Sequence, residues 1–255
     1  MDNNNKEKFH ENYIEGRNAV LEAFRSGKTI DKLFVLDGCQ DGPIKSITRE
    51  ARKHDAIINY VAKERLDQMS ETGKHQGVIA VSAAYEYAEV SDILENAERK
   101  GEPPFIIILD GIEDPHNLGA IIRTANQAGA HGIIIPKRRA VGLTPTVAKT
   151  SAGAINYTPV AKVTNISNTI KELKEKDMWF VCADMGGTTM YDLNLTGPIG
   201  LVIGNEGDGV SKLVKENCDM TASIPMVGDI DSLNASVATG VLAYEIVRQR
   251  LKSGK

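Results

Sequence analysis

The sequence predicts an α/β protein whose sheet is mostly parallel and covered by helices on both faces. Short apolar runs suited to buried strands alternate with segments whose apolar residues recur at helical spacing, and this order repeats through the second half of the chain. The chain has 255 residues, of which 42% are hydrophobic and 25% charged. This is an ordinary globular composition, with enough length for one large domain or two smaller ones.

The first part of the chain predicts a polar tail followed by a small α/β domain. Residues 1–12 contain an asparagine run and lack the apolar stretch of a signal peptide, so we expect a disordered tail. Residues 13–84 alternate between helix-like and strand-like pieces. A helix is expected over residues 18–25, with strands over residues 33–36 and 57–61.

An acidic segment, residues 85–103, follows this domain. Residues 85–102 hold 2 basic and 6 acidic side chains, whereas residues 1–84 hold 13 of each and residues 103–255 hold 15 of each. The net charge of −4 therefore originates in this segment. We expect an exposed linker, partly helical over residues 90–99, and place the domain boundary here.

The last part of the chain, residues 104–255, predicts the parallel sheet itself. The expected strands cover residues 105–110, 132–136, 179–183, 199–204 and 222–225, and the expected helices cover residues 118–128, 145–154, 166–176, 210–217 and 232–251. Strands interleaved with helices are typical of a sheet buried on both faces. In the first helix Leu118, Ile121 and Ala125 form an apolar stripe, whereas Arg123 falls outside it.

The loops after the strands are the places to seek a site, because ligands of such sheets bind beyond the carboxyl ends of the strands. The first loop, after residues 105–110, is rich in turn residues and leads into a helix. Asp114 with Pro115, or Asn117, can serve there as a simple helix cap. Arg123 can serve as a surface ion-pair partner. Local evidence leaves capping and substrate contact both open.

The second loop, residues 204–209, contains three glycines in six positions. Such a loop permits positive φ and close approach of the backbone to a ligand. Its spacing is not the GxGxxG of dinucleotide-binding folds, and the Lys-Ser/Thr of a P-loop is missing, so nicotinamide and nucleoside triphosphate cofactors are not supported. Glu206 is either solvated or a hydrogen-bonding partner of a substrate.

The third segment leads into the terminal helix. Ser232 is placed to cap that helix, and Asn234 and Ser236 add donors and acceptors beside its free backbone N–H groups. Capping and substrate contact are compatible roles for Ser232.

Other chemistries lack their signatures. Cys39, Cys182 and Cys218 form no paired motif, so we expect free, buried thiols rather than disulfides or a zinc site. The five histidines show no metal-ligand spacing, and no GxSxG elbow is present, although His116 and Ser232 could meet in space. No apolar run is long enough to cross a bilayer, so we expect a cytoplasmic protein without a metal or a membrane anchor.

The charge balance gives no general sign of nucleic-acid binding, since such proteins often carry a basic excess. An RNA-binding surface would have to be a local patch. The clearest candidate is Lys137-Arg138-Arg139, with a solvated loop as the alternative.

Taken together, these segments resemble a known family. Asp114-Pro115-His116-Asn117-Leu118-Gly119-Ala120-Ile121-Ile122-Arg123-Thr124-Ala125, Leu201-Val202-Ile203-Gly204-Asn205-Glu206-Gly207, and Ile224-Pro225-Met226 with Ser232-Leu233-Asn234-Ala235-Ser236-Val237-Ala238 are similar to the three motifs of SpoU (TrmH-type) RNA ribose methyltransferases. Residues 14–20 and 74–78 resemble the substrate-binding domain of the bacterial large-subunit (23S) rRNA guanosine 2′-O-methyltransferases. The likeness extends over the chain from about residue 13.

The resemblance implies a SPOUT-type catalytic domain with a trefoil knot, preceded by a small α/β RNA-binding domain similar to a ribosomal protein. It also implies S-adenosylmethionine as cofactor, 23S rRNA as partner, and a homodimer. The implied catalytic residues are Asn117, Arg123, Glu206, Ser232 and Asn234, and the implied cofactor-binding residues are Ile203, Gly204, Asn205, Ile224, Met226 and Leu233.

Within this set Arg123 either accepts the proton of the 2′-hydroxyl or stabilises the oxyanion that forms there. The second role is physically easier, because a guanidinium stays protonated in proteins. Three alternatives remain open: a tRNA ribose methyltransferase of the same family, an RNA-binding ribosome-assembly factor without catalysis, and a metabolic oxidoreductase.

Overall fold

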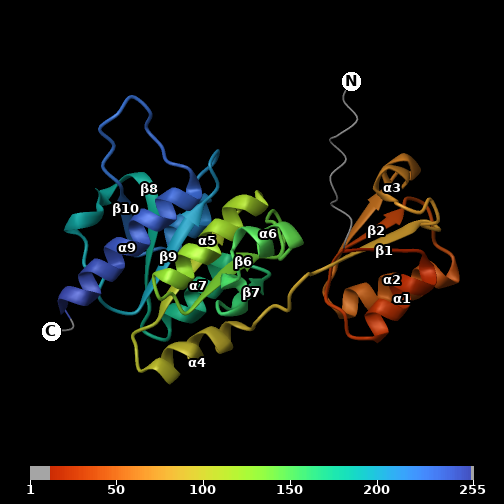
Figure 1. Cartoon of the computed structure of the whole chain (residues 1–255), viewed down its shortest axis with the longest axis horizontal. Coiled ribbons are helices and arrows are strands. Elements are labelled where there is room, and N and C mark those ends of the chain that lie inside the picture. Colours follow the sequence, from red (N-terminus) through yellow and green to blue (C-terminus); the bar gives the residue numbers. More distant parts are fainter. Residues whose placement is uncertain (1–11, 254–255) are drawn as a thin grey trace. The chain divides into compact units, whose positions relative to one another are not determined.

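The computed structural model describes residues 12–253 and divides them into two compact units (Figure 1). The first unit holds the described residues up to Glu86 together with Gly142–Pro145, and the second holds Tyr87–Val141 and the chain from Thr146 onward. Except for Asn12, the expected tail lies outside the described residues. No helix in residues 12–253 is both long enough and apolar enough to span a membrane.

The first unit is a four-stranded mixed sheet in the order β1-β4-β2-β3. Its strands are β1 (Tyr13–Glu15), β2 (Ile30–Leu36), β3 (Ile57–Val61) and β4 (Val78–Ser82), and its helices are α1 (Arg17–Arg25), α2 (Gly42–Lys53) and α3 (Lys63–Met69). β4 runs antiparallel to β1 and β2, whereas β2 and β3 are parallel. β3 is therefore an edge strand.

Helices cover both faces of this sheet. α1 and α2 bury Val20, Phe24, Ile44 and Ile47 against Leu33 and Val35 of β2. On the other face α3 buries Leu66 and Met69 against Ile79 of β4. Because side chains alternate across a strand, β2 contributes to both cores.

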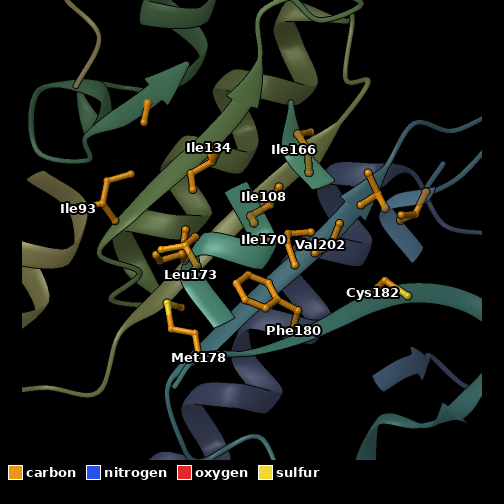
Figure 2. Close-up of a cluster of buried hydrophobic side chains, with 14 residues drawn as sticks. Ile93, Ile108, Ile134, Ile166, Ile170, Leu173, Met178, Phe180, Cys182 and Val202 are labelled. Atoms are coloured by element: carbon orange, nitrogen blue, oxygen red, sulfur yellow. The ribbon is translucent and has the colours of Figure 1, made fainter. Parts of the chain in front are cut away.

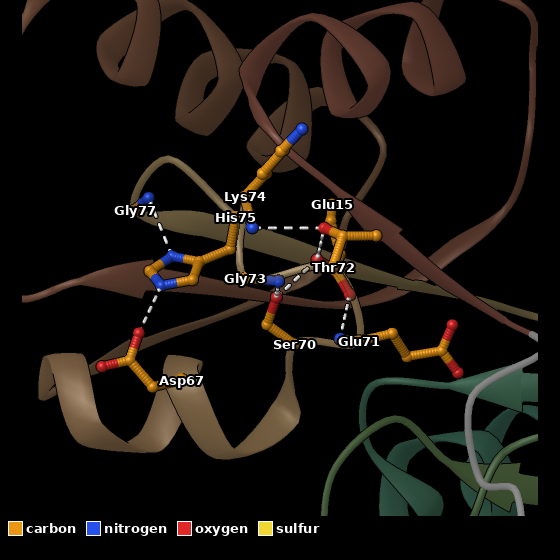
Figure 3. Close-up of polar contacts among 9 residues, drawn as sticks. All are labelled: Glu15, Asp67, Ser70, Glu71, Thr72, Gly73, Lys74, His75 and Gly77. Atoms are coloured by element: carbon orange, nitrogen blue, oxygen red, sulfur yellow. Dashed lines mark hydrogen bonds and ion pairs between the residues drawn. The ribbon is translucent and has the colours of Figure 1, made fainter.

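One carboxylate organises the loop between α3 and β4 (Figure 3). Glu15 accepts hydrogen bonds from Ser70 Oγ, the Glu71 backbone N–H and Thr72 Oγ1 at 2.6, 2.6 and 2.7 Å. Partial burial acts to raise the pKa of Glu15, but these hydrogen bonds, led by that of Ser70, hold it below its ordinary value. The buried His75 ring closes the same loop through Gly77 and Asp67.

The second unit is a six-stranded sheet in the order β10-β8-β9-β5-β6-β7, and every neighbouring pair is parallel. This confirms the expected architecture. Its strands are β5 (Phe105–Asp110), β6 (Gly132–Pro136), β7 (Val160–Val163), β8 (Trp179–Thr189), β9 (Ile199–Gly204) and β10 (Met220–Ser223). Its helices are α4 (Val90–Lys100), α5 (Pro115–Gln127), α6 (Pro145–Thr150), α7 (Ile166–Lys174), α8 (Lys212–Asn217) and α9 (Ala235–Ser253), with short 3₁₀ turns at Ala154–Asn156 and Met190–Asp192.

This sheet forms the middle of three layers. On one face α4, α7 and α8 enclose a core that includes Ile93, Ile170, Leu173 and Phe180 (Figure 2). On the other face α9 packs on β9 and α5 packs on β6, and these two helices lie side by side (Figure 1). The strands are buried on both faces, which explains their nearly continuous apolar sequences.

The acidic segment contains the helix that was expected over residues 90–99, but it is not an exposed linker. Most of it forms α4, whose Ile93 and Ala97 are buried in the second unit and whose end is capped by Gly101 in the left-handed region. Its acidic residues lie on the outer side of an amphipathic helix, where charge is solvated. Composition alone suggested a linker because the helix presents few apolar residues.

The strand order places several loops at one edge of the sheet. β5 and β9 are neighbours, and from them the chain extends to β6 on one side and β8 on the other. The side chain of Asp110, which ends β5, accepts the backbone N–H of Ser211 at 2.8 Å. Val141 donates to the carbonyl of Ile112 at 2.9 Å, which joins the loops after β5 and β6. This edge is the topological switch point where ligands bind in such folds.

Candidate functional site

A pocket of about 260 Å³ opens at the carboxyl ends of β8, β9 and β10. Three segments far apart in the sequence form its wall: residues 183–185, residues 203–209, and the chain from Ala222 to Ala238. All six predicted cofactor-binding residues line it, namely Ile203, Gly204, Asn205, Ile224, Met226 and Leu233. Glu206 and Ser232 line it as well.

The glycine-rich loop after β9 is shaped by its own side chains. Asn205 Oδ1 accepts the backbone N–H groups of Gly207 and Asp208 at 2.9 and 2.7 Å, and Gly209 has a φ of +67°. A Cβ on Gly204 would collide with the backbone of Gly209, so this close approach requires glycine. The Asn205 side chain thus holds the loop, which leaves the neighbouring backbone to meet a ligand.

Asn117, Glu206 and Asn234 form a continuous hydrogen-bonded line. The Asn117 side-chain amide donates to Glu206 Oε1, and Asn117 Oδ1 accepts from Asn234 Nδ2 at 3.0 Å. Asn117 is only 8% exposed, whereas Glu206 and Asn234 are exposed. The line therefore fixes two accessible polar groups through one buried amide.

The start of α5 explains why Asn117 is free for this role. Asp114 Oδ1 accepts the backbone N–H of His116 at 2.8 Å, and Pro115 occupies the first turn. Asp114 is therefore the helix cap, and Asn117, three positions later, points to the loop after β9.

The predicted capping role of Ser232 is wrong. α9 begins at Ala235, and Asn234 Oδ1 accepts the backbone N–H groups of Ser236 and Val237 at 2.9 and 3.4 Å. Asn234 is thus the capping residue. Ser232 lies in the exposed segment before the helix, and within residues 12–253 its hydroxyl has no hydrogen-bond partner. It remains available to a ligand.

Arg123 is not brought to the pocket of its own chain. It lies six residues beyond Asn117 on α5, which places it about 9 Å further along the axis and on another side of the helix. The side chain is exposed and makes no ion pair within the described part of the chain. Its exposed guanidinium can meet an anion that comes from outside.

The basic triplet after β6 lies at the same edge of the sheet as the pocket. Arg138 and Arg139 are exposed, and the Arg139 carbonyl lies beside Gly111 of the loop after β5. Parallel strands gather these loops on one side, so the positive charge adjoins the candidate site.

Sequence reasoning missed the contribution of β8. Ala183, Asp184 and Met185 line the pocket, and Asp184 bonds to Lys215 Nζ at 2.7 Å. The hydrogen bond from Lys215 lowers the pKa of Asp184, and the same bond raises the pKa of Lys215. The signal was present, because Asp184 follows the apolar part of a strand and parallel strands place such residues at the ligand edge.

The predicted lack of a metal site and of disulfides can be compared with residues 12–253 only. No group of three or more His, Cys, Asp or Glu side chains is arranged there for a metal ion. Cys182 is buried, but Cys39 and Cys218 are only partly buried, and all three thiols are free.

The pocket thus combines an apolar wall with a polar rim. Ile203, Ile224, Met226 and Leu233 supply apolar surface, and the polar side chains in the lining include Ser232 and the carboxylates of Asp184, Glu206, Asp208 and Asp231. Such a lining suits a small molecule with a flat apolar part and a few hydrogen-bonding groups. The hydrogen-bonded line and the basic triplet can then receive a second, anionic partner.

Family comparisons agree with this division into two units. Residues 104–244 match the model of the SpoU rRNA Methylase family. Residues 13–88 match a model described as RNA 2′-O ribose methyltransferase substrate binding.

Similar proteins cover nearly the whole chain. YacO of Bacillus subtilis, which carries the name of a TrmH family tRNA/rRNA methyltransferase, is 50% identical over 245 residues, or 95% of this chain and 98% of that protein. The SpoU methyltransferase AviRb of Streptomyces viridochromogenes, solved with AdoMet, is 26% identical with a TM-score of 0.60, and the match covers 94% of this chain and 90% of that one. The TrmH/SpoU tRNA modifying enzyme of A. aeolicus is 28% identical with a TM-score of 0.55, over 64% of this chain and 86% of that one.

Proposed function

Because this chain belongs to the SpoU rRNA methylase family, we propose that it methylates a ribose 2′-hydroxyl of RNA, with a guanosine of bacterial 23S rRNA as the target. It is an S-adenosylmethionine-dependent RNA methyltransferase of the TrmH/SpoU family. One observation carries the finer proposal: the hydrogen-bonded line from Asn234 through Asn117 ends at Glu206, which lines the pocket. A ribose and its phosphate need such fixed polar groups.

The pocket residues fit S-adenosylmethionine. Ile224, Met226 and Leu233 offer apolar contact to an adenine ring, and the backbone around Gly204 offers donors and acceptors to its edge. The Ser232 hydroxyl and the Glu206 carboxylate line the same pocket and remain for the RNA. When bound, the cofactor supplies a methyl group on a positively charged sulfur.

The chain's own residues then have three tasks. Glu206 and Asn117 orient the ribose hydroxyl, and Ser232 with Asn234 holds the nucleotide or its phosphate. The hydroxyl proton passes to the Glu206 carboxylate that orients it, and Arg123 stabilises the negative charge that develops on the 2′-oxygen, because a fixed guanidinium is a strong partner for an oxyanion. Closure of the site around the RNA excludes water.

The position of Arg123 supports a homodimer as part of this proposal. Its side chain is exposed, does not line the pocket of its own chain and has no partner in the described residues. In a dimer this exposed guanidinium can complete the pocket of the partner subunit. The trefoil knot that the family resemblance implies belongs to the same proposal, as does a cytoplasmic location beside ribosomal RNA.

The first prediction tests Arg123. Arg123→Ala is expected to reduce methyl transfer to background while S-adenosylmethionine binding, measured by calorimetry, stays within about twofold. The side chain is exposed, so the fold does not depend on it. Equal loss of binding and transfer would indicate a structural role and would contradict the assignment.

The substrate itself is tested with tritiated S-adenosylmethionine. Total rRNA and total tRNA from a strain that lacks this protein are incubated separately with the enzyme, and the methylated nucleotide is mapped. Label on a 23S rRNA ribose supports the proposal. Label on tRNA ribose selects the tRNA alternative, label on a base removes ribose methylation, and absence of label in both pools favours an RNA-binding role without catalysis.

A further inference from the structure

A second concave surface lies in the first unit, on the side of the sheet covered by α2. A groove of about 680 Å³ runs between α2, the end of the edge strand β3, and the loop that follows β2. Gly38, Cys39, Lys45, Arg49, Arg52 and Tyr60 are among the residues that line it. The proposed catalytic site uses none of them.

Three cations form one stripe along this groove. Lys45, Arg49 and Arg52 are spaced four and three residues apart, so they project from the same side of α2. All three are exposed. Within residues 12–253, Lys45 and Arg52 have no ion-pair partner, and Arg49 approaches Glu50 only at 4.0 Å.

The acidic residues near the stripe do not neutralise it. Asp37 is the acidic residue that lines the groove; its carboxylate accepts the backbone N–H of Gly38 at 2.9 Å, and its single negative charge offsets only one of the three cations. Asp41 is paired with Arg17 at 2.6 Å and also caps α2 through the N–H of Ile44. The groove therefore keeps a positive potential that suits an anionic chain.

An exposed aromatic ring stands beside these cations. Tyr60 is 53% exposed and pairs in register with Val35 at the end of β3. Ile58, two positions earlier, packs into the core under α1 and α2, so the Tyr60 side chain is on the same face of the sheet as α2. Within residues 12–253 the sheet has no strand beyond β3 to cover this ring.

We propose that this groove binds an unpaired segment of the substrate RNA, with its phosphates on Lys45, Arg49 and Arg52 and a base stacked on Tyr60. The inference rests on the proposed function, since it assigns a surface to the RNA that the catalytic unit modifies. Cations alone would accept any nucleic acid, but a base can stack on a side chain only where it is not paired within a duplex. The combination therefore selects single-stranded RNA.

The cation stripe is tested by fluorescence anisotropy of the full chain with a short fluorescein-labelled oligouridylate. The double variant R49Q/R52Q is expected to bind about tenfold more weakly, and its salt slope should fall by about 1.4, since each lost phosphate contact removes about 0.7 for a single strand. The control K63Q/R65Q removes two exposed cations from α3, on the other face of the sheet. Equal weakening in both variants, or no binding by the unaltered protein at low salt, would overturn the proposal.

The stacking contact has its own pair of variants. Tyr60→Leu is expected to weaken oligouridylate binding about tenfold, whereas Tyr60→Phe keeps the ring and should bind as the unaltered protein does. A matched RNA duplex should bind equally well to all three proteins. If Tyr60→Leu binds the single strand normally, or weakens duplex binding to the same extent, the groove does not select unpaired RNA.

Methyl transfer measured in parallel separates the two proposals. If the unaltered protein labels rRNA but R49Q/R52Q and Tyr60→Leu bind and transfer normally, the groove proposal fails and the proposed function stands. If the unaltered protein labels no RNA, the proposed function fails, and the anisotropy series still decides whether the groove binds single strands. Far-UV circular dichroism confirms that each variant is folded.

Discussion

Each unit holds a glutamate against a loop, and the two glutamates are used in opposite ways. Glu15 accepts three hydrogen bonds from one short stretch, Ser70 to Thr72, so most of the capacity of its carboxylate is used. Among the described residues Glu206 accepts only the amide of Asn117 and stays exposed at a pocket. A carboxylate that accepts several hydrogen bonds from a loop stabilises that loop. A carboxylate that accepts only one and lies at a pocket can still accept hydrogen bonds from a ligand.

The two sheets differ in a corresponding way. The parallel sheet of the second unit gathers its loops at one edge, where residues from distant segments meet around a pocket. The mixed sheet of the first unit sends its loops to both edges, and its groove lies instead on a helix-covered face beside an edge strand. A parallel sheet brings the side chains of its loops together at one edge, whereas a mixed sheet places them at both edges and leaves its faces available for binding.

Of the two glutamate substitutions, Glu206→Gln should produce the larger effect on methyl transfer. The substitution keeps the shape and one acceptor but removes the negative charge, so we expect methyl transfer to fall about 100-fold through lost orientation and electrostatic fit. The melting temperature should hardly change, because the side chain is exposed. Initial rates at saturating cofactor and thermal unfolding test this. A large loss of stability with unchanged turnover would make Glu206 a structural residue like Glu15.

Glu15→Gln should show the reverse pattern. We expect a loss of about 2 kcal/mol of stability, since hydrogen bonds to a charged acceptor are replaced by bonds to a neutral one. The single tryptophan, Trp179, lies in the second unit, so its fluorescence transition should stay in place while hydrogen exchange at the Glu71 amide accelerates. An unchanged exchange rate would contradict the organising role of Glu15.

The pH dependence of this stability has a definite sign. The folded state holds the pKa of Glu15 below its ordinary value of 4.5, so the unfolded chain binds more protons and acid favours unfolding. The stabilisation is complete above 4.5 and is lost as the pH falls through the lowered pKa. The unaltered protein and Glu15→Gln should therefore converge in acid, as measured by urea unfolding across this range. A constant difference would show that ionisation is not involved.

The central strands could be read from the sequence because they are buried on both faces. Residues 105–110 and 199–204 were predicted with the observed bounds, and each is a short apolar run without alternation. β8 was predicted to end at residue 183 but continues to Thr189. Its polar end still pairs with β10 after a shift in register, and hydrophobic patterns do not report pairing of that kind.

The residues of the site could be predicted from the sequence, but the hydrogen bonds between them could not. Asn117 and Glu206 could be selected from loops at the ligand edge, whereas the bond between them spans 89 positions and depends on how β5 and β9 pair. The groove beside Tyr60 has no recognisable sequence motif. Its three cations form a binding surface only because α2 lies next to the edge strand β3, and the sequence alone does not show this. Sequence patterns therefore identify candidate site residues, but the order of the strands determines which of these residues are in contact.

The smallest effects on stability are expected at Asn234, which caps α9, and at Ser232, which does not. Asn234→Ala should destabilise the protein by about 1 kcal/mol, since it removes the acceptor for the first free N–H groups of the helix. Ser232→Ala should change stability by less than about 0.5 kcal/mol, because its exposed hydroxyl has no partner in the described chain. Thermal unfolding of both variants tests this difference, and equal losses of stability would contradict the capping role of Asn234. Ser232→Ala should also raise the KM for RNA at unchanged stability, since the proposed function assigns this hydroxyl to the nucleotide; an unchanged KM would remove Ser232 from the site.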